Sequence, residues 1–309
     1  MKSNKYEIDM CNGSIMDKLV SFALPLMLSG ILQLMFNAVD IIVVGRFSGS
    51  EALAAVGSTT ALINVFTNLF IGISLGANVL AARFFAAGRK EEMSETVHTS
   101  ITLALISGIL MAFVGLVFSK GALELMGTPE DVIGLSTLYM RIYFMGMPFF
   151  MLYNYGAAIL RAVGDTKRPL YFLIIAGVIN AGLNMVLVIV FGLGVAGVGI
   201  ATVFSQMVSC VLVLTCLCRT EGSYKLSFSK LSMKGYYLKQ IFQVGIPAGI
   251  QSTVINFSNA LLQSSVNSFG STAMAGYTAA NNILGFLYVS INSVTQACMS
   301  FTSQNFGVG

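Results

Sequence analysis

Long uninterrupted apolar runs dominate the chain, and polar residues gather in the short segments between them. A helix needs about 20 apolar residues to cross the hydrocarbon core of a bilayer. The runs lack the strict alternation of outer-membrane strands, so the pattern predicts an all-α bundle of transmembrane helices. The eight runs that reach this length cover residues 19–44, 52–81, 96–118, 133–158, 169–192, 197–218, 241–266 and 273–304.

The composition supports a polytopic membrane protein. Of the 309 residues, 56% are hydrophobic and only 10% are charged, which is too apolar for an ordinary soluble domain. The first apolar run is too long for the core of a cleavable secretory signal, and it follows the polar residues 1–17. We therefore expect the first helix to be a true span and the protein to be embedded in a lipid bilayer.

The net charge of +4 comes from basic residues that gather in alternate loops, so it indicates the membrane topology and gives no reason to expect a nucleic-acid partner. Alternate loops hold most of the basic residues, whereas the opposite loops hold only Arg46 and Lys120. By the positive-inside rule, this asymmetry predicts a multi-pass protein of the cell membrane with a cytoplasmic N-terminus. The 14 basic residues on the predicted cytoplasmic side are Lys2, Lys5, Lys18, Arg83, Arg89, Lys90, Arg161, Lys167, Arg168, Arg219, Lys225, Lys230, Lys234 and Lys239.

The chain contains an internal repeat. Phe22-Ala23-Leu24-Pro25 matches Val244-Gly245-Ile246-Pro247, and a Gly-Ser turn at residues 49–50 recurs at residues 270–271, so the period is 221 to 222 residues. Transporters are commonly built from such repeats, with the substrate site between the halves. Because the second copy stops after two helices, we expect the chain to be a fragment of a twelve-helix protein. The predicted parts are a cytoplasmic tail (1–18), a six-helix first lobe (19–218), a cytoplasmic connector (219–240) and the start of the second lobe (241–309).

Asp40 is the only charged residue between residues 19 and 44. A carboxylate in the middle of a membrane helix costs at least about 2.5 to 3.5 kcal/mol, and such residues usually belong to ion or substrate pathways. The alternative is a structural acid buried against a basic or amide neighbour. Gln33 and Asn37 share the helix face of Asp40, and such a polar stripe must face the bundle interior or a water-filled cavity. For these two amides, interhelical hydrogen bonding is an equal alternative.

The acid at position 40 occurs in the first copy of the repeat but not at the matching position of the second. The corresponding second-lobe helix carries amides at Asn256 and Asn259, but Asp40 aligns with Leu261 or Leu262. An acid required by the fold would be expected in both copies, so the asymmetry favours a coupling role for Asp40. The second-lobe candidates for lining a substrate cavity are Asn259, Gln263, Asn281 and Asn282.

Arg141 is the only basic residue well inside a predicted span. One hypothesis is that it pairs with Asp40 in one conformation and releases it in another, which would also place it in the substrate cavity. The alternative is that its long side chain extends to the outer interface. On the fifth predicted helix, Asn180 and Asn184 lie one turn apart on one face, and Thr202 lies on the sixth.

Several short motifs occur at defined places relative to the predicted helices. They are Pro25, Asn37-Ala38-Val39-Asp40 with Val44-Gly45, Leu53-Ala54-Ala55-Val56-Gly57, Leu160-Arg161-Ala162-Val163-Gly164-Asp165-Thr166-Lys167, and Gly194-Val195-Ala196-Gly197. With these motifs the chain resembles the multidrug and toxic compound extrusion (MATE) family, which belongs to a larger exporter superfamily that includes lipid-linked sugar flippases. The resemblance spans essentially the whole chain, and the Arg-Ala-x-Gly-Asp-Thr loop is its most specific part.

The resemblance implies two six-helix lobes that face each other across a central cavity and rock between inward-open and outward-open forms. It implies export of small organic, often cationic, substrates driven by inward flow of H⁺ or Na⁺, with no other cofactor. The cation site of resembling proteins matches this chain at Asp40, Tyr139, Asn180 and Thr202. Its second acid corresponds to Asn184, so Asp40 would carry the coupling charge alone and the coupling ion stays open.

Other functions are weighed against export. A flippase for an anionic lipid-linked glycan predicts a basic cavity, and an intramembrane enzyme needs a nucleophile with a base or a metal site. The five cysteines and the single histidine form no metal-binding spacing, so the only metal expected is Na⁺ at Asp40. A non-transport scaffold would not explain the repeat. We therefore expect a monomeric secondary-active multidrug antiporter, not an enzyme.

Overall fold

The computed structural model describes residues 6–267 and 271–308, and the regular structure of these residues is entirely helical. A π-helical segment, η1 (Met185–Val190), extends α6, and a short 3-10 turn, η2 (Phe228–Lys230), lies in the connector before α8. The α-helices are α1 (Ile15–Phe47), α2 (Ser50–Ala86), α3 (Lys90–Leu125), α4 (Glu130–Met145), α5 (Met147–Ala162), α6 (Lys167–Asn184), α7 (Gly194–Arg219), α8 (Gly235–Asn267) and α9 (Ser271–Val308).

The all-α membrane class is confirmed, but the predicted count of eight helices is wrong in one place. The apolar run 133–158 forms two helices, because α4 ends at Met145 and α5 begins at Met147. Pro148 lies in the first turn of α5. A proline in that position has no N–H to donate, and its ring clashes with the preceding turn. The helix is therefore interrupted at Gly146. The described residues therefore contain nine α-helices.

Five helical segments in the described part of the chain are long and apolar enough to cross a membrane. They are Ile15–Phe47, Ser50–Ala86, Lys90–Leu125, Lys167–Val190 and Gly194–Arg219. Helices α4 and α5 have 16 residues each, so neither reaches the length of a span alone. Helices α8 and α9 are long enough but carry more amide and hydroxyl side chains, which lowers their hydropathy.

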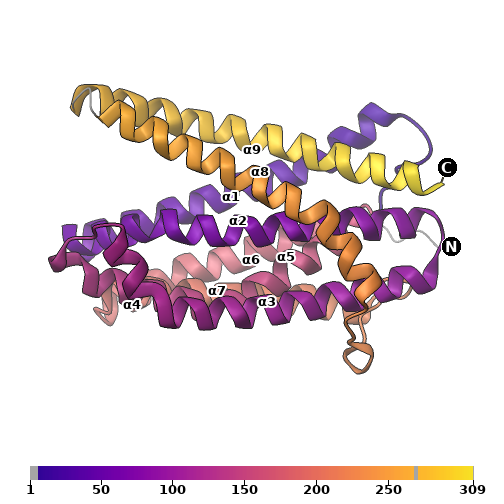
Figure 1. Cartoon of the computed structure of the whole chain (residues 1–309), viewed down its shortest axis with the longest axis horizontal. Helices are drawn as coiled ribbons and strands as arrows, with labels where there is room; N and C mark the ends of the chain where they lie inside the picture. Colours follow the sequence, from indigo (N-terminus) through magenta and orange to yellow (C-terminus); the bar gives the residue numbers. More distant parts are fainter. Residues whose placement is uncertain (1–5, 268–270, 309) are drawn as a thin grey trace.

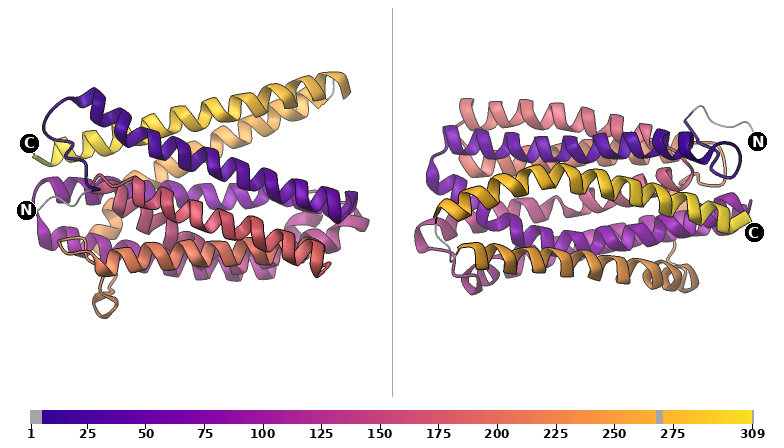
Figure 2. Two further views of the ribbon diagram at one scale, coloured as in Figure 1. Left: turned by 180° about the vertical axis from the view of Figure 1, so that it is seen from behind. Right: turned by 90° about the horizontal axis from the view of Figure 1, so that it is seen from above.

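The helices form a bundle of α1 to α7 with α8 and α9 placed along one side (Figure 1). Helix α8 packs mainly on α2, and α9 packs on α1 and α2. Close to the two chain termini, α9 runs beside the bundle, whereas at the opposite end α8 and α9 diverge from α1 and α2 (Figure 2). The molecule is thus closed at the end that carries the termini and splayed at the other end.

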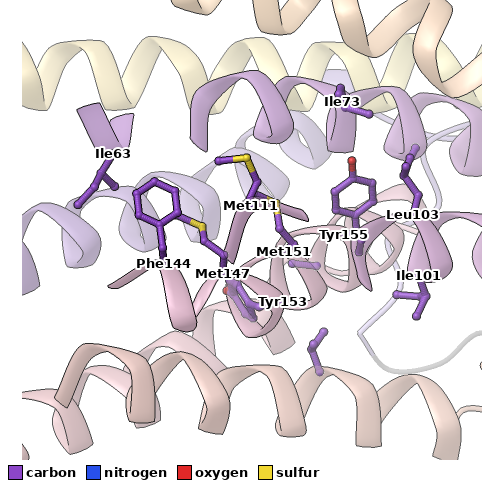
Figure 3. Packing of buried hydrophobic residues seen from close by; sticks show 14 of the residues in the cluster. Ile63, Ile73, Ile101, Leu103, Met111, Phe144, Met147, Met151, Tyr153 and Tyr155 are labelled. Carbon is purple, nitrogen blue, oxygen red and sulfur yellow. The ribbon is translucent and has the colours of Figure 1, made fainter. Parts of the chain in front are cut away.

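The main hydrophobic core lies inside the bundle of α1 to α7, which we call the first bundle, and it is rich in methionine and aromatic side chains (Figure 3). Phe144 at the end of α4 packs edge to face against Phe66 of α2, with ring centroids 6.0 Å apart. Met147, Met151 and Tyr155 of α5 are fully buried beside them. Burial of such large side chains fixes the broken pair α4 and α5 against α2 and α3, which is the wall behind the site described below.

Glycines allow α2 and α8 to cross with their backbones in contact. Gly72 and Gly76 on α2 face Gly245 and Gly249 on α8, and a Cβ added at any of the four would collide with backbone atoms of the partner helix. Both pairs have the small-x-x-x-small spacing that permits close helix approach in membranes. This close crossing of backbones joins α8 to the first bundle.

We expect Gly76→Ala to destabilise the protein by about 1 to 3 kcal/mol, because the added methyl group overpacks the crossing against the backbone at Ile241 and Gly245. Gly57→Ala, on the same helix, is the matched control, since a Cβ there meets nothing within 4 Å. Alanine should leave stability unchanged or raise it at that position. The measurement is the thermal unfolding of both variants in detergent, and equal melting temperatures would contradict the expectation.

Candidate functional site

A cavity of about 200 Å³ lies inside the first bundle, between α1, α4, α5, α6 and α7, with Ile71 of α2 also on its wall. Aromatic and small apolar side chains form much of its wall, and amides and hydroxyls form the rest. Among the described residues that line it, Asp40 is the only charged one. The polar side chains on its wall are Gln33, Asn37, Asp40, Tyr139, Tyr143, Tyr153, Asn154, Asn180, Thr202, Ser205, Gln206 and Ser209.

Asp40 is buried, with 7% of its surface exposed, and its partners are neutral. One carboxylate oxygen accepts a short hydrogen bond from the Asn184 amide, and the hydroxyl of Thr202 lies 3.4 Å from the other. The Asn184 amide also donates to the Asn180 side-chain oxygen at 3.2 Å, and the Asn180 amide lies 3.5 Å from the Thr202 hydroxyl. The four side chains therefore form one connected polar network drawn from α1, α6 and α7.

The position of Asn184 depends on an irregular stretch of backbone. Helix α6 ends at Asn184, and η1 follows directly over Met185–Val190. π-Helical turns are frequent at functional sites because they change the direction in which neighbouring side chains project. The side-chain oxygen of Asn184 is buried without a hydrogen-bond partner, so the network has one acceptor in excess. A bound cation or water would satisfy that oxygen.

Tyr139 belongs to the same cavity but to a second layer around the acid. It is buried, with 6% of its surface exposed, and its ring centroid lies 6.2 Å from that of Tyr143, one turn further along α4. Gln33 and Asn37 also line the cavity and are exposed to it along α1. The structure thus brings together all five residues of the predicted cation site and the α1 stripe.

The remaining predicted cavity residues are not brought to this site. Arg141 is exposed on α4 and lies outside the lining of the cavity, so it does not neutralise Asp40 in this conformation. Asn259 is exposed on α8, also away from the cavity. The side chains of Gln263, Asn281 and Asn282 lie outside the described residues.

The sequence analysis named Thr202 and Tyr139 but missed the rest of the polar face on α7 and the second tyrosine of α4, Tyr143. Thr202, Ser205, Gln206 and Ser209 occur at i, i+3, i+4 and i+7 and all line the cavity. This spacing is the same signal that identified the stripe on α1, since it puts the four side chains on one helix face. Small hydroxyl residues are common in membrane helices as packing residues, so the stripe was not distinctive without its partners.

The donor set around Asp40 is made of oxygen atoms and suits H⁺ or a hard cation. Carboxylate, amide and hydroxyl oxygens are the ligands that such cations prefer. Within the described residues, no cluster of three or more His, Cys, Asp or Glu side chains could hold a metal ion. One buried carboxylate with neutral oxygen neighbours can exchange a single positive charge, either as a proton or as a small cation.

Membrane-crossing helices arranged around a buried acid define a multi-pass membrane protein with an internal polar site. The MatE profile matches residues 25–186 of the chain, which include Asp40, Tyr139, Asn180 and Asn184. The chain therefore belongs to the MatE family, a family of transporters, and the resemblance found in the sequence is confirmed.

Relatives and solved structures agree with this assignment. The chain is 34% identical over 295 residues to the probable multidrug resistance protein YoeA of Bacillus subtilis, covering 93% of this chain and 63% of that protein. It is 29% identical over 304 residues to the probable multidrug resistance protein YpnP of the same organism, covering 97% and 67%. An outward-facing multidrug resistance MATE family transporter superposes with a TM-score of 0.91 at 25% identity, covering all of this chain and 68% of that one. The chain thus spans about two thirds of the length of these proteins.

Proposed function

We propose that this chain is part of a secondary-active exporter that moves organic, often cationic, compounds out of the cell in exchange for inward H⁺ or Na⁺. The observation that carries the proposal is a single buried carboxylate, Asp40, held by neutral amide and hydroxyl groups in a membrane cavity. Ionisable side chains inside a membrane bundle usually mark ion pathways or proton relays, and a carboxylate without a basic partner has its negative charge available for a proton or a small cation. The names of the relatives YoeA and YpnP support multidrug substrates.

The proposal assigns five side chains to the coupling site. Asp40 carries the exchangeable charge, Asn184 and Thr202 hydrogen-bond its two oxygens, and Asn180 holds both of them. Tyr139 closes the site from α4. Gln33 and Asn37 would line the path of the substrate, facing a second-lobe wall that includes Asn259, Gln263, Asn281 and Asn282.

The domain arrangement is part of the same proposal. Residues 19–218 would form the first lobe, residues 219–240 the connector, and α8 and α9 the start of the second lobe. Direct polar contacts between the lobes support this arrangement: Ser300 donates to Asn78 at 3.1 Å, and Gln304 donates to the Ala162 carbonyl at 2.6 Å. With the N-terminus in the cytoplasm, these contacts close the cytoplasmic side, and the splayed opposite end corresponds to an outward-facing state.

The charge of the cavity disfavours a flippase for anionic glycolipids. Such a substrate requires basic side chains in the cavity, whereas the charged side chain on the described wall is an acid. Arg141 does not change this balance, since its exposed position on α4 supports the alternative in which it extends to the outer interface.

The test is transport by the complete two-lobed protein in vesicles under imposed ion gradients. We expect efflux of a fluorescent organic cation to accelerate when a gradient of H⁺ or of Na⁺ is directed inward, and to return to the passive rate when that gradient is collapsed. Choline in place of Na⁺ is the control for ionic strength. Efflux that is indifferent to both gradients would contradict secondary-active transport.

A further inference from the structure

A short segment at the beginning of the chain crosses the closed end of the molecule. We call residues 6–12, which precede α1, the N-terminal strap. Near this end of the bundle lie the loop between α5 and α6, the connector before α8, and the last turns of α9 (Figure 1). The strap contacts all three.

On the side of the first lobe and the connector, the strap is held at three successive residues. The Ile8 N–H donates to the Gly164 carbonyl at 3.3 Å. The Glu7 carboxylate accepts a hydrogen bond from the Tyr224 hydroxyl at 2.6 Å, and the Arg168 guanidinium lies 5.5 Å from the centre of the Tyr6 ring.

The anchor at Arg168 is itself fixed. Arg168 forms a short ion pair with Asp165, whose side chain is fully buried in the loop between α5 and α6. The backbone N–H of Arg168 donates to the other oxygen of that carboxylate at 3.0 Å. Arg168 therefore offers the strap a rigid surface, since its guanidinium cannot follow Tyr6 without breaking a buried ion pair.

On the second-lobe side the strap is held by α9. Met10 has only 3% of its surface exposed and is buried in a cluster with Phe22 of α1 and with Ala297 and Phe301 of α9. The Met10 carbonyl accepts a hydrogen bond from the Asn305 amide at 3.1 Å. Phe22 and Phe301 meet edge to face beneath it, with ring centroids 6.3 Å apart.

We propose that the N-terminal strap is a latch that must leave α9 before the cytoplasmic side can open, since three successive residues hold it on the other side. This inference rests on the proposed alternating access of two lobes. Ile8 binds the first lobe and Met10 binds α9, and two residues of chain span at most about 7 Å even when extended. The loop at Gly164 and the end of α9 cannot separate further while both contacts hold. Release of the strap is thereby a step of the transport cycle.

The latch can be tested with a cysteine at Met10 of the complete protein, in a background in which the native cysteines, including the five of this chain, are replaced by serine. Reaction of Met10→Cys with a membrane-impermeant maleimide from the cytoplasmic side reports release, because the side chain is buried while the strap is bound. We expect Tyr224→Phe to accelerate labelling by about tenfold, as for the loss of one charge-assisted hydrogen bond. Tyr236→Phe, at an exposed tyrosine of α8, is the matched control and should leave the rate unchanged.

Coupling of the strap to the lobes is tested by locking them together. Asn78 and Ser300 contact each other across the lobes, so a disulfide between Asn78→Cys and Ser300→Cys holds the cytoplasmic side closed. We expect this disulfide to slow the labelling at position 10 by about tenfold or more, and reduction to restore it. Labelling that ignores the disulfide would mean that the strap moves independently of the lobes, and the proposal would be wrong.

A second measurement covers the case in which Tyr224→Phe fails to fold. Crosslinking of Met10→Cys to Asn305→Cys ties the strap to α9 without removing any first-lobe contact, and we expect it to stop efflux until it is reduced. Efflux that continues through this crosslink, with the first-lobe contacts still in place, would overturn the latch. If efflux depends on the ion gradients but the disulfide between Asn78→Cys and Ser300→Cys does not change the labelling rate, the latch is wrong and the proposed function stands. If that disulfide slows labelling but efflux does not depend on the H⁺ or Na⁺ gradient, the proposed function is wrong and the coupling of the strap to the lobes stands.

Discussion

Asp40→Asn is expected to abolish gradient-driven efflux while leaving the protein folded. Asparagine has nearly the same size and can still hydrogen-bond Asn184 and Thr202, so the network around position 40 keeps its packing. It has no charge to exchange, and no other charged side chain on the described wall can replace it. The variant should therefore show the same slow efflux with and without an inward gradient of H⁺ or Na⁺.

The matched control for this variant is Asp17→Asn, which makes the same chemical change at an exposed acid in the first turn of α1. That variant should transport at the rate of the unmodified protein. Thermal unfolding of both variants shows whether Asp40→Asn is folded, and a melting temperature close to that of the parent is expected. Undiminished gradient-driven efflux from a folded Asp40→Asn protein would remove Asp40 from the coupling step.

Asn184→Asp is expected to make the stability of the protein depend on Na⁺. The substitution removes the amide that donates to Asp40 and places a second carboxylate against the first. Two buried carboxylates repel each other unless a cation or a proton lies between them, and carboxylate pairs with neutral oxygens are good ligands for hard cations. Na⁺ at about 100 times its dissociation constant would then raise the free energy of unfolding by about 2.7 kcal/mol.

The measurement is the melting temperature of Asn184→Asp in NaCl and in choline chloride of equal ionic strength at neutral pH. Asn154→Asp is the control, because it adds one carboxylate to the wall of the same cavity on α5, away from the network of Asp40. Only Asn184→Asp should be stabilised specifically by Na⁺. A variant that melts at the same temperature in both salts would indicate that position 184 does not contribute a cation ligand.

The helices could be predicted from the sequence because lipid forces each span to be a continuous apolar run with internally satisfied hydrogen bonds. The break between α4 and α5 was not predicted, although Pro148 lies within the run 133–158. Proline is tolerated in many membrane helices as a kink, as at Pro25 inside α1, so its presence does not by itself show where a helix ends.

Part of the site could also be predicted, for reasons that differ between residues. The stripe of Gln33, Asn37 and Asp40 follows from helical periodicity, whereas the partners on α6 and α7 came only from the family resemblance. Contacts between distant helices depend on packing angles, which the pattern of one helix does not contain. For Arg141, the pattern of one helix was enough. Residues two apart point to nearly opposite faces of a helix, so a Tyr139 that faces the cavity implies an Arg141 that faces outward.

Under the proposed antiport, having Asp40 as the one charged side chain on the described wall of the cavity also limits how much work each transport cycle could do. If Asp40 exchanges one proton for one monovalent cation, no net charge crosses the membrane, and the membrane voltage contributes nothing to accumulation. One pH unit is worth about 1.4 kcal/mol, so each unit of pH difference could sustain about a tenfold concentration ratio of such a substrate. A second carboxylate at position 184 would permit a different stoichiometry, and with it a steeper ratio from the same gradient.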